Sequence, residues 1–466
     1  MAFSSVVFLC VFLPVVCILN WLMPGIRCKN ALLVVASLIF YAFGNPFYLL
    51  LLVGSVLCNY LAGLLVTHPR WGRLFLALAV AVNLGALAFY KYLGFLVQNL
   101  NLLLGTALPV PAIVLPVGIS FFTFQGLSYV IDVYRDHTLQ NRSFFEVLLY
   151  ICLFPQLVAG PIVKYRDIAA EIHTRRATLT DTAQGVRRFI LGLSKKLLLA
   201  DTAAGIADTV FGLEAGSLDI RLAWLGAVAY TLQIYFDFSG YSDMAVGLGW
   251  IFGFHFKENF DHPYSAGSIK QFWRRWHISL SSWFRDYLYI PLGGNRKGRL
   301  RMYLNKLVVF FFTGLWHGAN WTYVVWGLWH GAFLVAEDKL IPVERLRRPF
   351  RWVGHLYTLL VVVVGFVFFR AADLQQAGLM IQNLFAGFSI TAQSSAALAG
   401  LVDPYHLTAL VLGCVGSLPV LEPLRKAAQS RPALEAASYP AALVLLALDL
   451  IHLSAATFVP FIYFQF

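Results

Sequence analysis

A short polar segment inside an apolar stretch holds the residues of this sequence best suited to chemistry. Residues 313–322 read Thr-Gly-Leu-Trp-His-Gly-Ala-Asn-Trp-Thr and lie within the apolar run Leu307–Ala336. Polar and ionisable side chains are costly at membrane depth, so they indicate a functional site. His317 can exchange protons near neutral pH, and as a general base it could take the proton from an attacking hydroxyl.

Other side chains of the same segment could assist His317. If the segment is helical, Thr313, His317 and Asn320 line one side of the helix, as expected for the wall of a cavity. Asn320 or Thr322 could orient the imidazole or stabilise an oxyanion, and Trp316 is a further candidate for the wall. A structural role, in which a backbone carbonyl satisfies His317, remains the alternative.

A second Trp-His-Gly sequence, at 329–331, places His330 thirteen residues after His317. On one continuous helix with 3.6 residues per turn, this separation corresponds to a rotation of about 220°. We therefore expect His330 to face away from His317 and to have a structural or supporting role.

The segment 272–287 combines aromatic and basic residues: Phe-Trp-Arg-Arg-Trp-His-Ile-Ser-Leu-Ser-Ser-Trp-Phe-Arg-Asp-Tyr. If it is helical, Trp273, Trp276 and His277 share a face, because residues three and four apart are neighbours. The two arginines between them then point elsewhere, which is typical of an amphipathic helix at a membrane surface. His277 is a second candidate site residue, with a purely structural histidine as the alternative.

Three further segments carry polar side chains among apolar residues, at Gln125, Gln156 and Asp237. Two prolines surround Gln156, which predicts a broken or re-entrant helix. These side chains could line the same cavity as His317. They could equally hold helices together, since polar side chains bond across membrane helices and a buried acid needs only one basic partner.

Composition identifies the chain as a membrane protein. Of its 466 residues, 59% are hydrophobic and 12% are charged, and the mean hydropathy is +0.71. About 20 apolar residues span a bilayer, so the recurring apolar runs predict an all-α polytopic fold with roughly ten spans. We expect one domain, residues 1–466, with regular spans at 1–140, broken helices at 141–338 and plain spans at 352–466.

The net charge of +12 follows a membrane pattern and not that of a nucleic-acid-binding protein. Lys and Arg collect in the cytoplasmic loops of membrane proteins. The basic residues after the first, third and fifth apolar runs are Arg27, Lys29, Arg70, Arg73, Arg135 and Arg142. The loop 98–109 has no Lys or Arg, so we expect a periplasmic N-terminus. Met1–Pro24 lacks a basic start and a cleavage site, which predicts a retained first span.

A dense basic cluster extends from Lys270 to Arg301 among aromatic side chains. It could form a cytoplasmic opening that attracts an anionic cosubstrate such as a nucleotide or coenzyme A, with Arg274, Arg275 and Arg285 as candidate contacts. The alternative is a set of topology signals and lipid-headgroup contacts.

No P-loop, dinucleotide glycine motif or Gly-x-Ser-x-Gly elbow is present. The six cysteines form no Cys-x-x-Cys pair, so no metal site is suggested.

Five ordered motifs resemble the membrane-bound O-acyltransferase family, and within it the bacterial alginate O-acetyltransferase-like branch. They are Leu-Pro-Val-Gly-Ile-Ser-Phe-Phe-Thr-Phe-Gln at 115–125, Phe-Pro-Gln-Leu-Val-Ala-Gly-Pro at 154–161, Gln-Ile-Tyr-Phe-Asp-Phe-Ser-Gly-Tyr-Ser-Asp at 233–243, Phe-Trp-Arg-Arg-Trp-His at 272–277 and Trp-His-Gly-Ala-Asn-Trp at 316–321. The match covers most of the chain.

The resemblance implies a ring of membrane helices around a tunnel, with the essential histidine at His317 and a supporting one at His277. It implies that acetyl-coenzyme A in the cytoplasm is the donor, and that periplasmic partner proteins beyond the bacterial inner membrane O-acetylate an exopolysaccharide such as alginate.

An alternative function for the same fold is acyl transfer of D-alanyl groups, or acyl transfer to peptidoglycan or cellulose. The alternatives from other classes are a transporter or flippase of an acylated intermediate and a scaffold for a secretion complex. Transporters usually have repeated halves with matched broken helices, which this sequence lacks.

Overall fold

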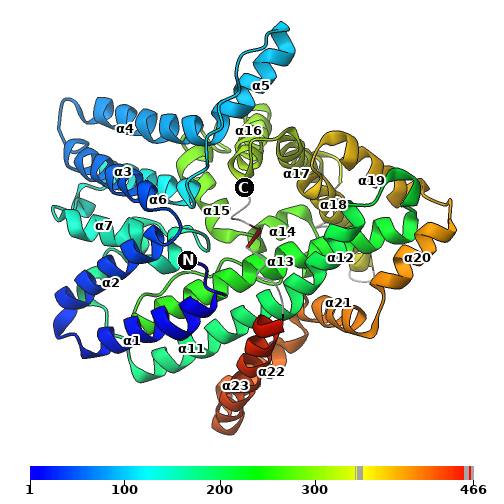
Figure 1. The fold of residues 1–466 in the computed structure, drawn as a ribbon. Coiled ribbons are helices and arrows are strands. Elements are labelled where there is room, and N and C mark those ends of the chain that lie inside the picture. Colours follow the sequence, from blue (N-terminus) through cyan, green and yellow to red (C-terminus); the bar gives the residue numbers. More distant parts are fainter. Residues whose placement is uncertain (342, 344–349, 456–460, 463–466) are drawn as a thin grey trace. The chain divides into compact units, whose positions relative to one another are not determined.

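The fold is entirely helical in the residues that the structure describes. The computed structural model describes residues 1–341, 343, 350–455, 461 and 462, and no strand occurs among them (Figure 1). The all-α fold predicted from the apolar runs is therefore confirmed. The predicted zone of plain spans at 352–466 extends at its end to residues outside the described ones.

The chain divides into two compact units that are interleaved along the sequence. One unit comprises Met1–Phe189 and Tyr241–Glu258, and the other comprises Ile190–Gly240 and Asn259–Phe466. The helices α11 (Leu179–Ser194) and α13 (Ile220–Ile251) contribute residues to both units. Two of the three boundaries between the units therefore fall inside helices, and the third, between Glu258 and Asn259, falls in a non-helical segment.

The first unit contains α6 (Ile119–Arg135), which is buried on nearly all sides. Small and polar residues allow close packing around it, because a Cβ at Gly126 would lie 2.5 Å from the amide nitrogen of Asn59. Asn59 and Asn83 exchange side-chain hydrogen bonds of 3.1 and 2.9 Å, which satisfies both amides between apolar helices. The other helices of this unit are α1 (Leu13–Leu22), α2 (Gly25–Ala42), α3 (Pro46–Leu65), α4 (Gly72–Leu87), α5 (Leu93–Leu104), α7 (Phe144–Cys152), α8 (Phe154–Leu157), α9 (Tyr165–Ile168) and α10 (Glu171–Thr174).

The second unit contains a tight helical hairpin of α16 (Arg299–His317) and α17 (Trp321–Lys339). Gly314 and Gly327 lie where the two helices meet, and a Cβ on either would overlap with a backbone carbonyl of the other helix. Only glycine permits this approach. The hairpin therefore holds its last α16 residue, His317, at its closed end. The other helices are α12 (Asp201–Phe211), α14 (Ile269–Arg275), α15 (Ile278–Phe284), α18 (Arg351–Arg370), α19 (Leu374–Ala386), α20 (Ala392–Leu401), α21 (Pro404–Gly416), α22 (Glu422–Ser430) and α23 (Pro432–Ala455).

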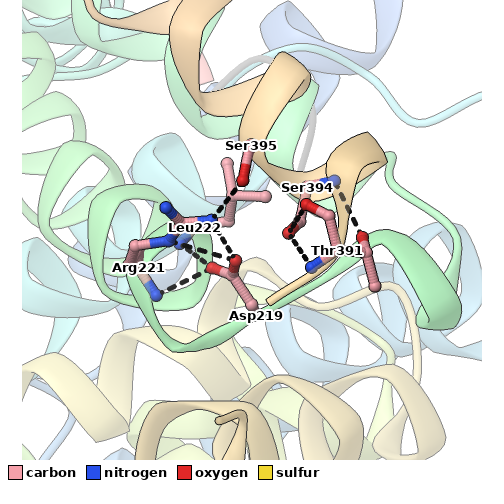
Figure 2. Close-up of polar contacts among 6 residues, drawn as sticks. All are labelled: Asp219, Arg221, Leu222, Thr391, Ser394 and Ser395. Atoms are coloured by element: carbon pink, nitrogen blue, oxygen red, sulfur yellow. Dashed lines mark hydrogen bonds and ion pairs between the residues drawn. The ribbon is translucent and has the colours of Figure 1, made fainter. Parts of the chain in front are cut away.

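A charged cluster within the second unit joins the start of α13 to α20 (Figure 2). Asp219 is fully buried and accepts backbone N–H bonds of 3.0 and 3.1 Å from Arg221 and Leu222. The Arg221 guanidinium donates to Asp219 at 2.7 Å and to the Ser395 hydroxyl at 3.0 Å. Burial acts to raise the pKa of Asp219, but hydrogen bonds from Arg221 and Ser394 outweigh it and lower the pKa to about 2.

Five of the described helices are long and apolar enough to cross a membrane. They are Gly25–Ala42, Pro46–Leu65, Arg351–Arg370, Pro432–Ala455 and Gly72–Leu104, the last of which joins α4 and α5 through the π-helical turn Ala88–Tyr92. The pair α20 and α21, bent by 72°, would make a sixth. The apolar runs predicted roughly ten. The difference arises because some runs are broken, as the run Leu307–Ala336 is divided into two helices after His317.

Candidate active site

The closed end of the α16–α17 hairpin is fixed by Asn320. Its side-chain oxygen accepts the N–H of Thr322 at 3.1 Å and so caps the first turn of α17. Its amide nitrogen donates to the carbonyl of Ala372 at 2.8 Å. The predicted single helix through Thr313, His317 and Asn320 is therefore wrong, because α16 ends at His317. Asn320 instead positions the turn that follows the histidine.

Aromatic rings surround the side chain of His317, which is 2% exposed. The ring centroids of Trp326 and Phe369 each lie 5.0 Å from the His317 centroid, and that of Trp316 lies 4.9 Å away. Thr313, one turn earlier on α16, donates its hydroxyl to the Val309 carbonyl at 2.8 Å. The imidazole is thus buried among aromatic rings and shielded from bulk water.

His277 lies beside His317, with 6.5 Å between the two ring centroids. It is fully buried and packs edge-on against Phe238 at 4.6 Å. The prediction of one helical face for Trp273, Trp276 and His277 is wrong, because α14 ends at Arg275. His277 instead occupies the turn between α14 and α15 with a φ of +43°, a left-handed conformation that is uncommon for residues other than glycine.

Asn259 is a neighbour of His277 that sequence reasoning missed. Its side-chain oxygen lies 3.1 Å from His277 Nδ1 and accepts hydrogen bonds from the Ser279 backbone at 3.1 Å and hydroxyl at 2.8 Å. Asn259 precedes the candidate helix by ten residues (269 minus 259) and belongs to no motif, so the sequence offered no signal for it.

The Trp326 ring contacts both His317 and His330. The Trp326 centroid is 5.0 Å from His317 and 5.2 Å from His330. His330 also stacks on Phe272 at 6.0 Å and is fully buried. The premise of one continuous helix was wrong, because α16 ends at His317 and His330 lies on α17.

A cavity of about 400 Å³ opens beside the hairpin and reaches Thr313. Three basic side chains line it, Lys270, Arg274 and Lys306, together with Trp273, Leu280, Ser281, Phe284, Val309, Phe310 and Leu334. Arg274 was predicted as a cosubstrate contact. The other two predicted arginines do not line this cavity: Arg275 donates to the Ser265 hydroxyl at 2.5 Å, and Arg285 pairs with Asp286 at 2.8 Å.

Acidic residues at the end of α17 pair with basic side chains of this cavity and cap the helix beside it. Asp338 pairs with both Lys270, at 2.5 Å, and Lys306. Burial acts to raise the pKa of Asp338, but the two lysines outweigh it and lower the pKa. The adjacent Glu337 is 6% exposed and accepts the backbone N–H groups of Ile269 and Lys270 at 2.6 and 3.1 Å. Both acids thereby hold the start of α14, the helix that leads to His277.

Asp237 lies in the second unit but is engaged in a buried ion cluster. It contacts Lys196 at 2.7 Å, and Lys196 contacts Asp201 at the same distance. The second carboxylate oxygen of Asp237 accepts the backbone N–H of Ile462 at 2.9 Å. The helix turn that carries Asp237 also carries Phe238, which packs against His277. Asp237 therefore has the basic partner that a structural role requires.

Gln125 and Gln156 belong to the first compact unit, whereas both candidate histidines belong to the second. The two glutamines are fully buried. Gln156 donates to the Tyr150 carbonyl at 2.5 Å. The structure therefore brings His277, His317, Trp316 and Thr313 into one unit, and the two glutamines into the other.

Known proteins are similar to this chain along most or all of its length. The profile described as MBOAT, membrane-bound O-acyltransferase family, matches residues 75–372, which include both histidines. A Pseudomonas aeruginosa protein named probable alginate O-acetylase AlgI is 40% identical, with 100% of both chains covered. A Pseudomonas putida protein of the same name is 42% identical, again over 100% of both chains. The peptidoglycan O-acetyltransferase of Helicobacter pylori is 37% identical over 80% of this chain and 78% of that protein.

Proposed function

Because this chain belongs to the membrane-bound O-acyltransferase family, we propose that it moves an acetyl group from cytoplasmic acetyl-coenzyme A to a hydroxyl acceptor for the O-acetylation of alginate or a similar exopolysaccharide. Membership of the family makes the chain an O-acyltransferase and a multi-pass membrane protein. The donor, the acceptor and the transfer across the inner membrane are the proposed parts. The names of the full-length relatives support the acetyl group and the alginate acceptor.

The observation that carries the chemistry is the pair of buried histidines with 6.5 Å between their ring centroids. In the proposed reaction, the acceptor hydroxyl attacks the thioester carbonyl while His317 takes the hydroxyl proton. The carbon–sulfur bond then breaks, the ester forms, and the departing thiolate takes a proton, so that coenzyme A leaves as the thiol. His277 is near enough to orient His317 or to share this proton through a hydrogen-bonded group.

The basic cavity supports an anionic donor. Lys270, Arg274 and Lys306 place positive charge along a cavity whose remaining wall is largely apolar. A phosphate-bearing thioester needs both features, because its phosphates pair with cations while its arm packs against apolar side chains. The cavity reaches Thr313, one turn before His317 on α16. This arrangement would guide the thioester towards the histidine pair from the basic side, which we assign to the cytoplasm.

Peptidoglycan is the second candidate acceptor. The peptidoglycan O-acetyltransferase of Helicobacter pylori is 37% identical over 80% of this chain, so the same site would serve either polymer. We further propose that the N-terminus is periplasmic and that partner proteins in the periplasm complete the transfer. Measuring the acetyl content of exopolysaccharide and of peptidoglycan, in cells with and without the protein, would identify which polymer is the acceptor.

The test of the catalytic proposal compares two histidines in the same local sequence, Trp-His-Gly. His317→Gln should reduce acetyl transfer from radiolabelled acetyl-coenzyme A by about 100-fold or more, the usual size of a general-base contribution. His330→Gln is the matched control and should retain most activity, because His330 packs against Phe272 and Trp326 and has no part in the proposed proton transfer. Full activity of folded His317→Gln would overturn the proposal. A wild-type protein that moves an acylated molecule across vesicles without transferring acetyl groups would instead identify a transporter.

A further inference from the structure

We propose that Asn259 is a positioning residue that keeps the His277 proton on Nδ1 and leaves Nε2 as the proton-accepting atom of the ring. This inference deepens the proposed acyl transfer and rests on it for its kinetic consequences. The hydrogen-bond geometry that supports it lies entirely within the second unit and does not depend on the reaction.

The identity of the Asn259 atom that faces His277 follows from Ser279. The backbone N–H of Ser279 can only donate, and it lies 3.1 Å from the Asn259 side-chain oxygen. An amide nitrogen at that position would place two donors against each other, so the oxygen assignment is required by the network. The Ser279 hydroxyl, at 2.8 Å, donates to the same oxygen.

The tautomer of His277 follows from that assignment. The Asn259 oxygen is an acceptor and lies 3.1 Å from His277 Nδ1. A neutral imidazole has one N–H and one lone pair, and a lone pair on Nδ1 would repel the amide oxygen. The Ser279 hydroxyl also lies 3.4 Å from Nδ1, but its 2.8 Å bond to the Asn259 oxygen is the shorter one and uses its single hydrogen. Nδ1 therefore carries the proton. Nε2 then holds the lone pair, which is the form that a histidine needs to accept a proton or a hydrogen bond.

Asn259 also holds the backbone of His277 in its unusual conformation. A left-handed residue other than glycine costs roughly 1–3 kcal/mol and persists only where its surroundings over-determine it. Here the Asn259 carbonyl accepts the N–H of Ile278 at 2.9 Å, and the N–H of Asp261 donates to the Arg275 carbonyl at 3.0 Å. Main-chain bonds on both sides of His277, together with the side-chain contact, thus fix the direction of the ring.

The fixed ring direction matters because of what lies around His277. Phe238 meets the imidazole edge-on at 4.6 Å, and the Trp316 centroid is 5.8 Å away. These rings restrict rotation of the imidazole, so the Asn259 contact decides which nitrogen carries the proton. In the reaction, Nε2 can accept a proton or order a bridging hydroxyl near His317.

The kinetic test uses Asn259→Ala and Asn259→Asp in the full-length protein. Asn259→Ala should lower kcat about 100-fold with little change in the KM for acetyl-coenzyme A, since a loosely held catalytic group is misplaced but the donor cavity is intact. Asn259→Asp keeps the acceptor oxygen and adds negative charge that favours a protonated imidazole. Its activity should return at alkaline pH, with the acid limb of the pH profile moved to higher pH.

The matched control is Ser282→Ala, which removes a hydroxyl from the same short helix, where it donates to the Ser279 carbonyl at 2.9 Å. Its acid limb should coincide with that of the wild type. If Asn259→Asp has an unshifted acid limb, Asn259 does not act through His277 and the proposal is overturned. Because Asn259→Asp keeps the acceptor oxygen, it remains informative if Asn259→Ala does not fold.

A second measurement does not depend on enzyme activity. Nitrogen NMR of protein labelled with 15N-histidine distinguishes the two neutral tautomers, and the resonance that disappears in His277→Gln belongs to His277. We expect the Nδ1-protonated form in the wild type and a mixture of tautomers in Asn259→Ala. A wild-type His277 protonated on Nε2 would refute the tautomer assignment, even if acyl transfer is confirmed. The assignment would equally survive a failure of the proposed acyl transfer.

Discussion

Replacing Glu337 by alanine should loosen the first turn of α14, the helix that contributes side chains to the basic cavity and leads to His277. Glu337 is 6% exposed and accepts the N–H groups of Ile269 and Lys270 at 2.6 and 3.1 Å. The first N–H groups of a helix have no partner within the helix, so a side chain must satisfy them when they are buried. In Glu337→Ala, these two donors lose their acceptor.

The size of the effect follows from the two bonds. A hydrogen bond to a charged group contributes about 1.5–3 kcal/mol net, and water that enters the space left by the side chain recovers part of this. We expect a local loss of about 3 kcal/mol. Because 1.4 kcal/mol corresponds to a factor of ten, the first turn of α14 should open about 100-fold more often. Glu337→Gln retains one acceptor oxygen and should give a smaller increase.

Hydrogen exchange followed by mass spectrometry measures this opening directly. Peptides that cover residues 268–272 should exchange about 100-fold faster in Glu337→Ala, since exchange reports local opening free energies. The α19 helix is an internal control, because its own cap, Asp373, accepts from Gln376 at 2.8 Å. Exchange in 268–272 that stays within about threefold of the wild type would refute the claim that Glu337 holds the helix.

Three further changes test other parts of the structure. Lys306→Ala should raise the KM for acetyl-coenzyme A about tenfold with a similar kcat, because one ionic contact is lost, and a KM that is unchanged at low salt would contradict the donor assignment. Gly327→Val should lower the midpoint of thermal unfolding sharply, since the added side chain forces the α16–α17 hairpin apart; an unchanged midpoint would show that the close approach is dispensable. The pKa of Asp219 in the folded protein, about 2, lies below the ordinary pKa of an aspartate. The ionised carboxylate therefore stabilises the fold fully at pH values above that ordinary pKa, and this stabilisation is lost as the pH falls through about 2. Arg221→Ala removes the guanidinium that lowers this pKa, so acid unfolding should begin at higher pH than in the wild type, as followed by intrinsic fluorescence; coincident acid transitions would argue against the pairing.

The helical class was predictable from the sequence for physical reasons, and the same reasons made the two main histidines candidate site residues. Apolar runs leave helices as the main way to satisfy the backbone in a membrane, and ionisable residues inside such runs are costly enough to indicate a site. His277 and His317 are forty residues apart (317 minus 277), yet their ring centroids lie 6.5 Å apart. Their proximity followed from the resemblance and not from the local pattern.

Local periodicity did not predict the breaks between helices. Both predicted polar faces assumed that a helix continues through the histidine, whereas α14 ends at Arg275 and α16 ends at His317. The end of α16 depends on tertiary contacts, such as the bond from Asn320 to the Ala372 carbonyl, that no short window of sequence contains. Asn259 was missed for the same reason, because its acceptor role exists only when the chain places it beside Ser279.

The interleaving of the two compact units has a consequence for biosynthesis. The first unit includes Tyr241–Glu258 as well as Met1–Phe189, so its packing cannot be complete when residue 189 leaves the ribosome. Arg175, for example, donates to the carbonyl of Phe252 at 3.0 Å. At about 5–20 residues per second, the 69 residues between positions 189 and 258 (258 minus 189) take roughly 3–14 s to synthesise. During this interval the early helices are in the membrane with a vacant packing surface, which makes them candidates for the insertion machinery to shield.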